Sequence, residues 1–240
     1  MKKKTKVSTP FPTFPHGGRS ALNPPEIVRT KDGSDTLFVS ELNEHYHSVH
    51  GAIQESDHIF IRNGVSTYPG DQVRIFEVGF GTGLNTLLTL IECIGNKKVL
   101  YTAIENYPLE SELVTGLNYP GFFPGICPEI FKKLHSCRWD VVNKITETFR
   151  LHKMMGDLTS MQLYGEFDII YFDAFGPEKQ PEMWSDDIFR KISGITARNG
   201  ILVTYSAKGE VKRSLIRNGF KVSLLPGPPG KRHFIRAVKI

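Results

Sequence analysis

Four short apolar runs recur along the chain, at residues 73–79, 98–105, 167–175 and 200–207, and a stretch with helical spacing follows each of them. Strands that are buried on both faces of a parallel sheet are continuously apolar in this way. The alternation of such strands with helices predicts an open sheet with helices on both sides. We therefore expect an α/β fold built on a mostly parallel sheet.

The segments outside this alternation predict additions to the sheet. Residues 27–40 predict a β-hairpin with its turn at Asp32-Gly33. Residues 51–64 predict a helix that stops at Gly64, whereas residues 119–128 are rich in Pro, Gly and Phe and predict a loop. Residues 219–240 read as two strands joined by a Pro/Gly turn, so we expect an antiparallel hairpin at one edge of the sheet.

These elements suggest three parts of the chain. Residues 1–25 predict a disordered basic leader, residues 26–70 a small hairpin-and-helix extension, and residues 71–240 the main domain. The length of 240 residues suits one large domain with small additions and permits a sizeable core. The sequence carries no signal for an oligomeric state.

The formal net charge of +5 is unevenly distributed. The first six residues contribute +4, and residues 208–240 carry nine Lys and Arg against one Glu, which leaves −7 for residues 7–207. An acidic body with a basic end favours contact with a polyanion such as nucleic acid. A solvated basic face without a partner fits the charge equally well.

The chain carries no membrane or export signal. No apolar run reaches the ~20 residues needed to cross a bilayer, and no apolar core follows the basic N-terminus. Cys93, Cys127 and Cys137 are odd in number and form no CxxC pair, which disfavours a disulfide framework or a zinc ribbon. We predict a cytoplasmic protein with free thiols.

The first strand candidate runs directly into a glycine-rich turn, "FEVGFGTGLNTLLTL". Ligands of open α/β sheets bind at the carboxyl ends of the strands, near the point where the strand order reverses. Gly79, Gly81 and Gly83 have the spacing G-x-G-x-G, and Leu84 stands where a dinucleotide fingerprint requires its third glycine. The turn therefore favours a ligand without a pyrophosphate.

Acidic residues around this turn complete a predicted cofactor site. Glu77 can accept a ligand amine while the N–H groups of the turn meet a carboxylate. Glu105 suits the ribose hydroxyls, and Asp157, after a strand-like run, suits an adenine amino group. Each of these acids taken alone also fits a helix cap, but their order favours S-adenosylmethionine or a relative. Asn85 and Leu158 complete the predicted set.

The stretch "FDIIYFDAFGPEKQPEMW" places another carboxylate at a strand end. Asp173 is expected to point into the same crevice as the glycine turn, although a cap on the following loop is the alternative. Phe175 and Trp184 follow it and suit stacking on an unstacked base, while core packing is the commoner role of a Trp.

Three segments, "GFGTGLN", "DAFGPEKQPEMW" and "GFKVSLLPGPPGKR", resemble the bacterial tRNA 5-methylaminomethyl-2-thiouridine methyltransferases. The resemblance covers all but about the first 27 residues, and its most specific part is the D-x-F-x-P-x-K-x-P-x-M-W block. It implies a Rossmann-like class I methyltransferase fold, S-adenosylmethionine as methyl donor, and the aminomethyl group of a tRNA wobble uridine as acceptor. By position it implies cofactor binding by Gly79, Gly81, Glu105 and Asp157, and an acid/base role for Asp173.

The chain departs from that family in two ways. Bifunctional members carry a flavin-dependent oxidoreductase domain that first removes a carboxymethyl group, whereas this chain ends at Ile240 and resembles the stand-alone methyltransferase. We therefore expect no oxidoreductase activity. Gln180 and Glu182 also replace the Asn and Asp of many relatives, and both changes are conservative.

The segment "ELNEHYHSVHGAIQ" concentrates histidines. His47 and His50 would share one face of a helix, but no Cys or carboxylate cluster accompanies them, so we predict no metal. A similar Tyr-His pair lines the substrate side in related folds, which implies a lid with Tyr46 beside the cofactor and His47 beside the substrate.

Basic residues near the C-terminus are expected to bind phosphates of the tRNA anticodon arm. The predicted set comprises Lys208, Lys212, Arg213, Lys231 and Arg232. Two other functions stay open. A polyamine aminopropyltransferase or small-amine methyltransferase fits the acidic body but not the basic C-terminal face, and a non-catalytic nucleic-acid-binding module fits the charge but not the three acidic residues at strand ends.

Overall fold

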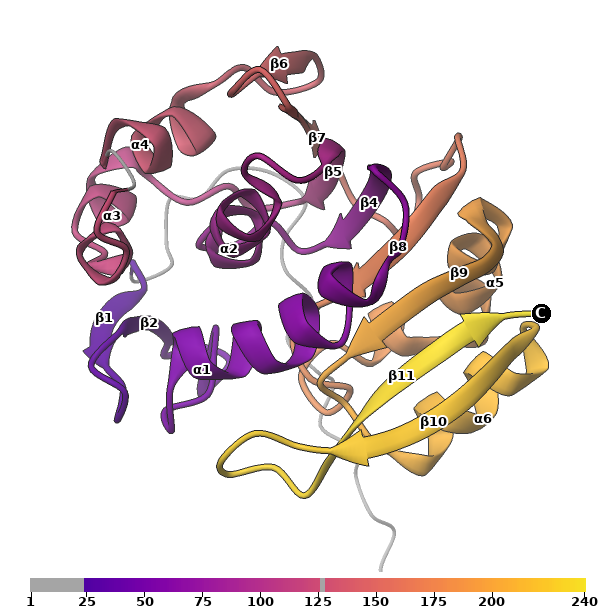
Figure 1. Cartoon of the computed structure of the whole chain (residues 1–240). Coiled ribbons are helices and arrows are strands. Elements are labelled where there is room, and N and C mark those ends of the chain that lie inside the picture. Colours follow the sequence, from indigo (N-terminus) through magenta and orange to yellow (C-terminus); the bar gives the residue numbers. More distant parts are fainter. Residues whose placement is uncertain (1–23, 126–127) are drawn as a thin grey trace, which may run out of the picture.

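An eight-stranded sheet with helices on both faces forms the centre of the protein (Figure 1). The computed structural model describes residues 24–125 and 128–240, so residues 1–23 of the predicted leader and Cys127 lie outside the described part. The strands are β4 (Gln72–Val78), β5 (Lys98–Glu105), β6 (Val142–Lys144), β7 (Phe149–Met155), β8 (Phe167–Phe172), β9 (Thr196–Thr204), β10 (Phe220–Pro226) and β11 (His233–Lys239).

The strand order is β10-β11-β9-β8-β4-β5-β7-β6. The five inner strands β9, β8, β4, β5 and β7 run parallel, whereas β6 and β11 run antiparallel to their neighbours. From β4 the chain first builds the sheet outward through β5 and β7, and then returns to build β8 and β9 on the other side. The order therefore reverses between β4 and β8. The four predicted strands and the closing hairpin are confirmed.

Strand β7 was predicted only as a strand-like run before Asp157 and was not among the four apolar strand candidates. Its side chains alternate between buried and more exposed positions, and the polar Arg150, His152 and Lys153 interrupt the apolar pattern. A strand that is not continuously apolar escapes a search for apolar runs, even though it lies inside the sheet.

The helices cover the two faces of the sheet (Figure 1). They are α1 (Ala52–Ser56), α2 (Leu84–Cys93), α3 (Ser111–Thr115), α4 (Pro128–Ser136), α5 (Asp186–Ile195) and α6 (Gly209–Arg217). A π-helical turn, Asp57–Arg62, continues α1, so the helix predicted over residues 51–64 is confirmed in two parts. The loop predicted over residues 119–128 contains a 3-10 turn, Tyr119–Phe122, and α4 already begins at Pro128.

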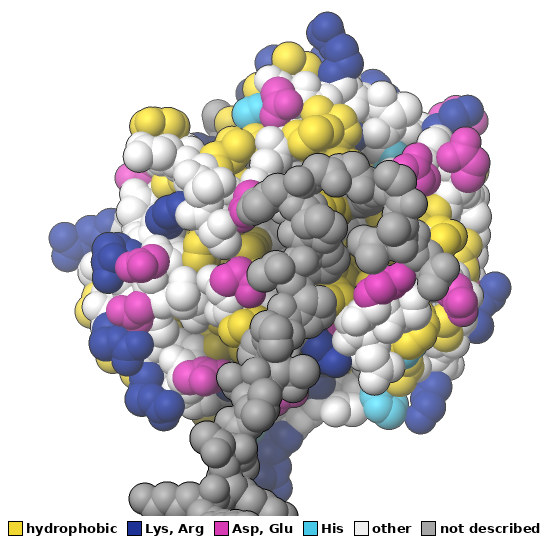
Figure 2. Space-filling model, turned by 180° about the vertical axis from the view of Figure 1, so that it is seen from behind, with side chains coloured by type: hydrophobic (Ala, Val, Ile, Leu, Met, Phe, Trp, Pro, Cys, Tyr) yellow, Lys and Arg dark blue, Asp and Glu magenta, His cyan; other side chains and the backbone are white. Residues whose placement is uncertain are grey.

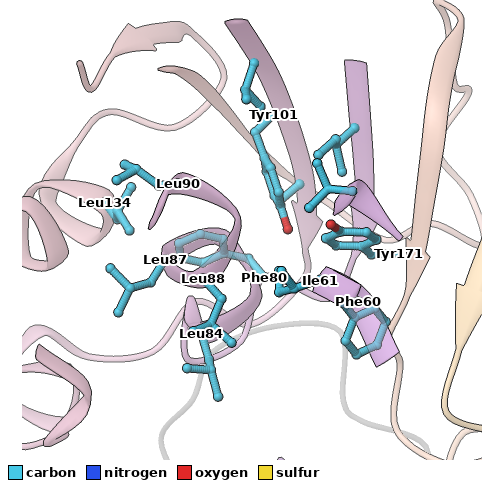
Figure 3. Packing of buried hydrophobic residues seen from close by; sticks show 14 of the residues in the cluster. Phe60, Ile61, Phe80, Leu84, Leu87, Leu88, Leu90, Tyr101, Leu134 and Tyr171 are labelled. Carbon is cyan, nitrogen blue, oxygen red and sulfur yellow. The ribbon is translucent and has the colours of Figure 1, made fainter. Parts of the chain in front are cut away.

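Each face of the sheet has its own apolar core. On one face, leucines of α2 pack with Phe60, Tyr101 and Tyr171 (Figure 3). On the other face, apolar side chains of α5 and α6 pack against β8, β9 and β11. Because Phe60 belongs to the predicted extension, the extension shares its core with the main domain. The division at residue 70 stays a prediction.

The extension contributes a second, three-stranded sheet of β1 (Glu26–Arg29), β2 (Asp35–Val39) and β3 (Glu44–His45). The predicted hairpin is confirmed, since β1 pairs antiparallel with β2. Asn118 attaches this hairpin to the main domain: its Oδ1 accepts from the N–H of Asp35, and its Nδ2 donates to the carbonyl of Gly33, both at 2.9 Å.

Residues 46–51 form bends and turns rather than a helix. The expectation that His47 and His50 share a helical face is therefore wrong. The spacing of the two histidines does not produce a helix here, because the chain leaves β3, which pairs with β2, immediately before this segment. Over residues 24–125 and 128–240, no helix is both long and apolar enough to cross a membrane.

Removal of the Leu87 side chain tests the first core. Leu87 of α2 is fully buried within this core, so Leu87→Ala leaves a cavity and is expected to lower the free energy of unfolding by about 2–5 kcal/mol. Chemical denaturation measures the change. Ile216→Ala on α6, where the side chain is 51% exposed, is the control and should shift stability by less than about 0.5 kcal/mol. Equal losses in both variants would contradict this description of the core.

Candidate active site

A cavity of about 660 Å³ opens at the carboxyl ends of β4, β5 and β8. This position coincides with the reversal of strand order between β4 and β8, where ligands of open α/β sheets bind. Its size is in the range of small-molecule sites. Eleven residues predicted for the site line it: Tyr46, His47, Gly79, Gly81, Asn85, Glu105, Asp157, Leu158, Asp173, Phe175 and Lys231.

The glycine turn after β4 forms one wall of this cavity. Gly79 and Gly81 have φ values of +88° and +48°, in the left-handed region that favours glycine. A Cβ at position 79 would lie 3.0 Å from the carbonyl oxygen of Asp173, and a Cβ at position 81 would lie 3.1 Å from the ring of Tyr46. The turn therefore packs closely against β8 on one side and against the extension on the other.

Gly83 does not line the cavity with the two other glycines. It precedes α2, and a Cβ there would lie 2.7 Å from Nε2 of His135. That ring packs on Phe80, and its burial lowers the pKa of His135 to about 3. In this arrangement Gly83 permits close packing of the turn against His135, and its contact with a cofactor stays a prediction.

Glu105 supports the glycine turn from the end of β5. Its Oε2 accepts from the N–H of Gly81 at 3.0 Å, and its Oε1 accepts from the N–H of Tyr107 at 2.8 Å. A carboxylate has further lone pairs, and this one also borders the cavity. Asp157 lies beyond β7, where its Oδ1 accepts from the N–H of Thr159 at 2.8 Å. Both predicted acids thus stand on the same side of the cavity.

One amide joins two carboxyl groups at the floor of the cavity. Asn85 donates from Nδ2 to Oε1 of Glu77 at 3.0 Å and to Oδ2 of Asp173 at 2.8 Å. Glu77 is only 1% exposed and lies beneath the cavity rather than in its wall. Its burial raises the pKa of Glu77 well above the usual range and favours the neutral form. It therefore meets Asn85 where we had expected a ligand amine.

Asp173 has the electrostatics of a proton acceptor. Burial raises the pKa of Asp173 to about 7, and the facing carboxylate of Glu55 acts in the same direction. The hydrogen bond from Asn85 and the ammonium of Lys231 oppose the shift. A carboxyl group whose pKa lies near neutral pH, in a cavity, is suited to general acid/base chemistry.

Glu55 is a cavity residue that the sequence analysis missed. It is 7% exposed on α1, its Oε2 accepts from the N–H of Ser48 at 2.8 Å, and its Oε1 lies 3.1 Å from Nζ of Lys231. The signal was present in the sequence, since Glu55 occupies the buried face of the helix together with Ala52 and Ile59. An acid at such a position is rarely buried without a partner.

Aromatic residues divide between the cavity wall and the core. Phe175 lines the cavity, and its ring lies edge-on to Tyr46 with centroids 5.0 Å apart. Trp184 is buried against Phe172, and its Nε1 donates to the carbonyl of Phe175 at 2.7 Å. The Trp184 ring thus packs in the core, the alternative role given for it above, and its stacking on a base stays a prediction. His47 is also buried, which lowers its pKa to about 4 and favours the neutral imidazole.

A second, shallower hollow of about 420 Å³ adjoins the cavity. Lys208, Lys231 and Arg232 of the predicted basic set line it, together with Lys179 and His233, which were not predicted. Glu44 and Glu178 also line it, and Glu178 forms an ion pair with Lys208. Lys212 and Arg213 line neither depression. In the view from behind, most of the visible Lys and Arg side chains lie at the periphery, while several acidic side chains lie closer to the centre (Figure 2).

Among residues 24–125 and 128–240, no three His, Cys, Asp or Glu side chains are placed to hold a metal ion. The histidines of residues 45–50 are therefore not part of such a cluster within the described chain. The absence of a metal stays a prediction.

Comparisons with known proteins place these observations in a family. The model of an S-adenosyl-L-methionine-dependent methyltransferase family matches residues 129–240. The tRNA 5-methylaminomethyl-2-thiouridine biosynthesis bifunctional protein MnmC of Cupriavidus metallidurans is 30% identical over 230 residues, which are 88% of this chain and 33% of that protein. MnmC of Magnetococcus marinus is 31% identical over 213 residues, with 81% and 31% covered. The chain thus spans about a third of the length of these curated relatives.

Solved structures resemble the whole fold. The crystal structure of MNMC2 from Aquifex aeolicus superposes with a TM-score of 0.74 at 28% identity and covers 91% of this chain and 71% of that one. Spermidine synthase from Thermotoga maritima superposes with a TM-score of 0.51 at 12% identity, covering 86% of this chain and 68% of that one, a likeness of fold alone. The predicted Rossmann-like methyltransferase fold is confirmed.

Gly81→Ala tests the contact between the glycine turn and Tyr46. The new Cβ would strain the left-handed backbone and displace the ring, so we expect a loss of stability of about 1–2 kcal/mol and a loss of S-adenosylmethionine affinity of about ten-fold or more. Calorimetric titration measures the affinity. Gly95→Ala is the matched control, because its φ is +75° but no heavy atom lies within 4 Å of the added Cβ. Unchanged affinity for S-adenosylmethionine in Gly81→Ala would contradict a role of the glycine turn in cofactor binding.

Proposed function

Because the chain belongs to a family of S-adenosyl-L-methionine-dependent methyltransferases, we propose that it is a cytoplasmic enzyme that methylates the aminomethyl nitrogen of 5-aminomethyluridine or its 2-thio form at the tRNA wobble position. The product is the corresponding 5-methylaminomethyluridine. The observation that carries this proposal is Asp173, a carboxyl group with a pKa near 7 beside the glycine turn.

The cavity has the features that S-adenosylmethionine requires. When bound, this donor supplies a methyl group on a sulfonium, whose C–S bond breaks as the acceptor nitrogen attacks. Gly79 and Gly81 line the cavity without side chains of their own, so a ligand could approach the backbone of the turn there. Glu105 would hold the ribose hydroxyls and Asp157 the adenine amino group, and the apolar Leu158 would pack beside the base.

The amino-acid portion of the donor would lie near Asn85 rather than against Glu77. Oδ1 of Asn85 is buried and accepts no hydrogen bond from the described residues, so it is available to an N–H donor at the cavity wall. Glu77 would act through the amide, by fixing its orientation from below. Glu77 is thus proposed as a positioning residue.

Asp173 would make the acceptor nitrogen reactive. An alkylamine is largely protonated at neutral pH, because such amines titrate near the lysine value, and a protonated nitrogen has no lone pair for attack. Asp173 in its ionised form would take the proton from the bound ammonium group. The cavity walls would hold the freed amine in line with the methyl group, which lowers the entropic part of the barrier.

The acceptor assignment rests on the relatives and on charge. Both MnmC proteins are named for biosynthesis of tRNA 5-methylaminomethyl-2-thiouridine, and this chain matches about a third of the length of each. Lys208 and Arg232 border the hollow beside the cavity and would bind phosphates of the anticodon arm, while Phe175 would stack on the uridine. The likeness to spermidine synthase concerns the fold alone, so a polyamine substrate is not favoured.

Asp173→Asn removes the proton acceptor but keeps an oxygen that can accept from Asn85. We expect kcat to fall by about 10²–10⁴-fold, while S-adenosylmethionine still binds. Methyl incorporation into tRNA that carries 5-aminomethyluridine gives the rate, and calorimetry gives the affinity. The same change at Asp187, an exposed residue of α5, is the control.

The pH dependence of kcat/KM is a second test of the role of Asp173. Since ionised Asp173 is the active form and its pKa is about 7, kcat/KM of the wild type should rise as the pH increases through about 7 and should fall below it. The residual activity of Asp173→Asn should lack this limb. If Asp173→Asn has normal turnover, or if its activity still rises with pH near 7, Asp173 is not the acid/base group.

Lys208→Met and Arg232→Met test the tRNA surface. Each substitution removes one proposed phosphate contact, so KM for tRNA should rise and the slope of log KM against log salt concentration should decrease by about one. Lys98→Met, at the opposite end of β5, is the control and should leave both unchanged. If the three variants behave alike, the hollow lined by Lys208 and Arg232 is not the tRNA surface.

A further inference from the structure

The ammonium group of Lys231 occupies one corner of the cavity. Its Nζ lies 3.1 Å from Oε1 of Glu55 and 4.3 Å from the centroid of the Tyr205 ring. Lys231, Glu55 and Asp173 line the same cavity. Chemically, this Nζ is a primary alkylammonium, which is the group that an aminomethyl substituent also carries at neutral pH.

The corner is built from fixed groups. The N–H of Ser48 holds Glu55 from one side, and the hydroxyl of Tyr205 donates to the carbonyl of Ala174 at 2.8 Å. Ala174 directly follows Asp173, so the Tyr205 ring is fixed beside the proposed proton acceptor. A carboxylate together with an aromatic face is a favourable environment for an ammonium group.

The hydrogen bonding of Glu55 leaves room for another donor. Among the contacts of the described residues, its buried Oε1 accepts no hydrogen bond of regular geometry, although Lys231 Nζ is close. The ion pair therefore balances the charge of Glu55 without satisfying its oxygen. Such an oxygen can accept an N–H from a ligand.

The Lys231 side chain also has a second possible position, in the adjoining hollow. It lines the adjoining hollow with Lys208 and Arg232 as well as the cavity. The backbone before it is fixed, since Gly230 has a φ of +87° and a Cβ there would lie 2.2 Å from the ring of His50. A change of position is thus left to the Lys231 side chain, which has a flexible four-carbon stem.

We propose that the corner formed by Glu55, Tyr205 and Asp173 is the subsite for the alkylammonium group of the acceptor, and that Lys231 fills it until the acceptor binds. This inference rests on the proposed function. The acceptor ammonium takes the place of Lys231 Nζ against Glu55 and Tyr205, and its proton then goes to Asp173. Lys231 turns toward the adjoining hollow, where a phosphate neutralises it.

A double-mutant cycle separates this role from a purely structural one. Glu55→Gln keeps the acceptor for Ser48 but loses the charge, and Lys231→Met removes the internal occupant. We expect Glu55→Gln to lower kcat/KM for tRNA bearing 5-aminomethyluridine at least about ten-fold, both in the wild type and in Lys231→Met. If Glu55→Gln has no further effect in Lys231→Met, Glu55 serves only to hold Lys231 and the proposal is overturned.

A binding measurement makes the test independent of turnover. Ethylammonium is titrated into the wild type and the variants, and its binding is followed by saturation-transfer NMR. Lys231→Met should bind the ion at least about ten-fold more tightly than the wild type, because the subsite is vacant, and the added Glu55→Gln should abolish this gain. The control, Lys98→Met, should match the wild type. Equal binding by all four proteins would overturn the subsite.

The two experiments distinguish the two proposals. Absence of methyl transfer to tRNA by the wild type would refute the proposed function, whereas the ethylammonium titration would still report on the corner. Methyl transfer that does not respond to Glu55→Gln would leave the function intact and refute the subsite.

Discussion

The amide of Asn85 holds together two carboxyl groups that would otherwise repel each other. Glu77 belongs to β4, Asp173 directly follows β8, and the same Nδ2 donates to both. Burial raises the pKa of Glu77, and the nearby Asp173 carboxyl acts in the same direction. Glu77 therefore favours its neutral form, and Asp173, which lines the cavity, is the one of the two that can exchange a proton with a ligand. The proposed chemistry thus depends on one side chain at the start of α2.

Much of the fold and part of the site could be predicted from sequence, because the relevant signals are local. A continuously apolar run reports burial on both faces, and a glycine turn after such a run marks the carboxyl end of a strand. The position of Asp173 followed from the same rule. These signals determine which end of the sheet carries the site, and the cavity lies at that end.

The parts that escaped prediction depend on how distant segments pack. The helical position of Glu55 indicates that it is buried, but no local pattern indicates that α1 lies beside the loop that carries Lys231, which is what brings Glu55 into the cavity. Trp184 looked suited to stacking because it lies near the strand-end aspartate, yet its ring turns inward to Phe172. His47 and His50 had helical spacing without a helix, since pairing of β3 with β2 determines the local backbone.

The order of the strands also bears on synthesis of the protein. β11 lies between β10 and β9 but follows β10 in the chain, so β10 has no partner while the ribosome has yet to make β11. Until then, the backbone groups at the edge of β9 are unpaired and open to association with other chains. The loop that carries Lys231 joins β10 to β11, so both of its ends are anchored in the sheet only once β11 has paired with β9. Vectorial folding thus completes the proposed acceptor corner last, after the glycine turn and Asp173 are already in the nascent domain.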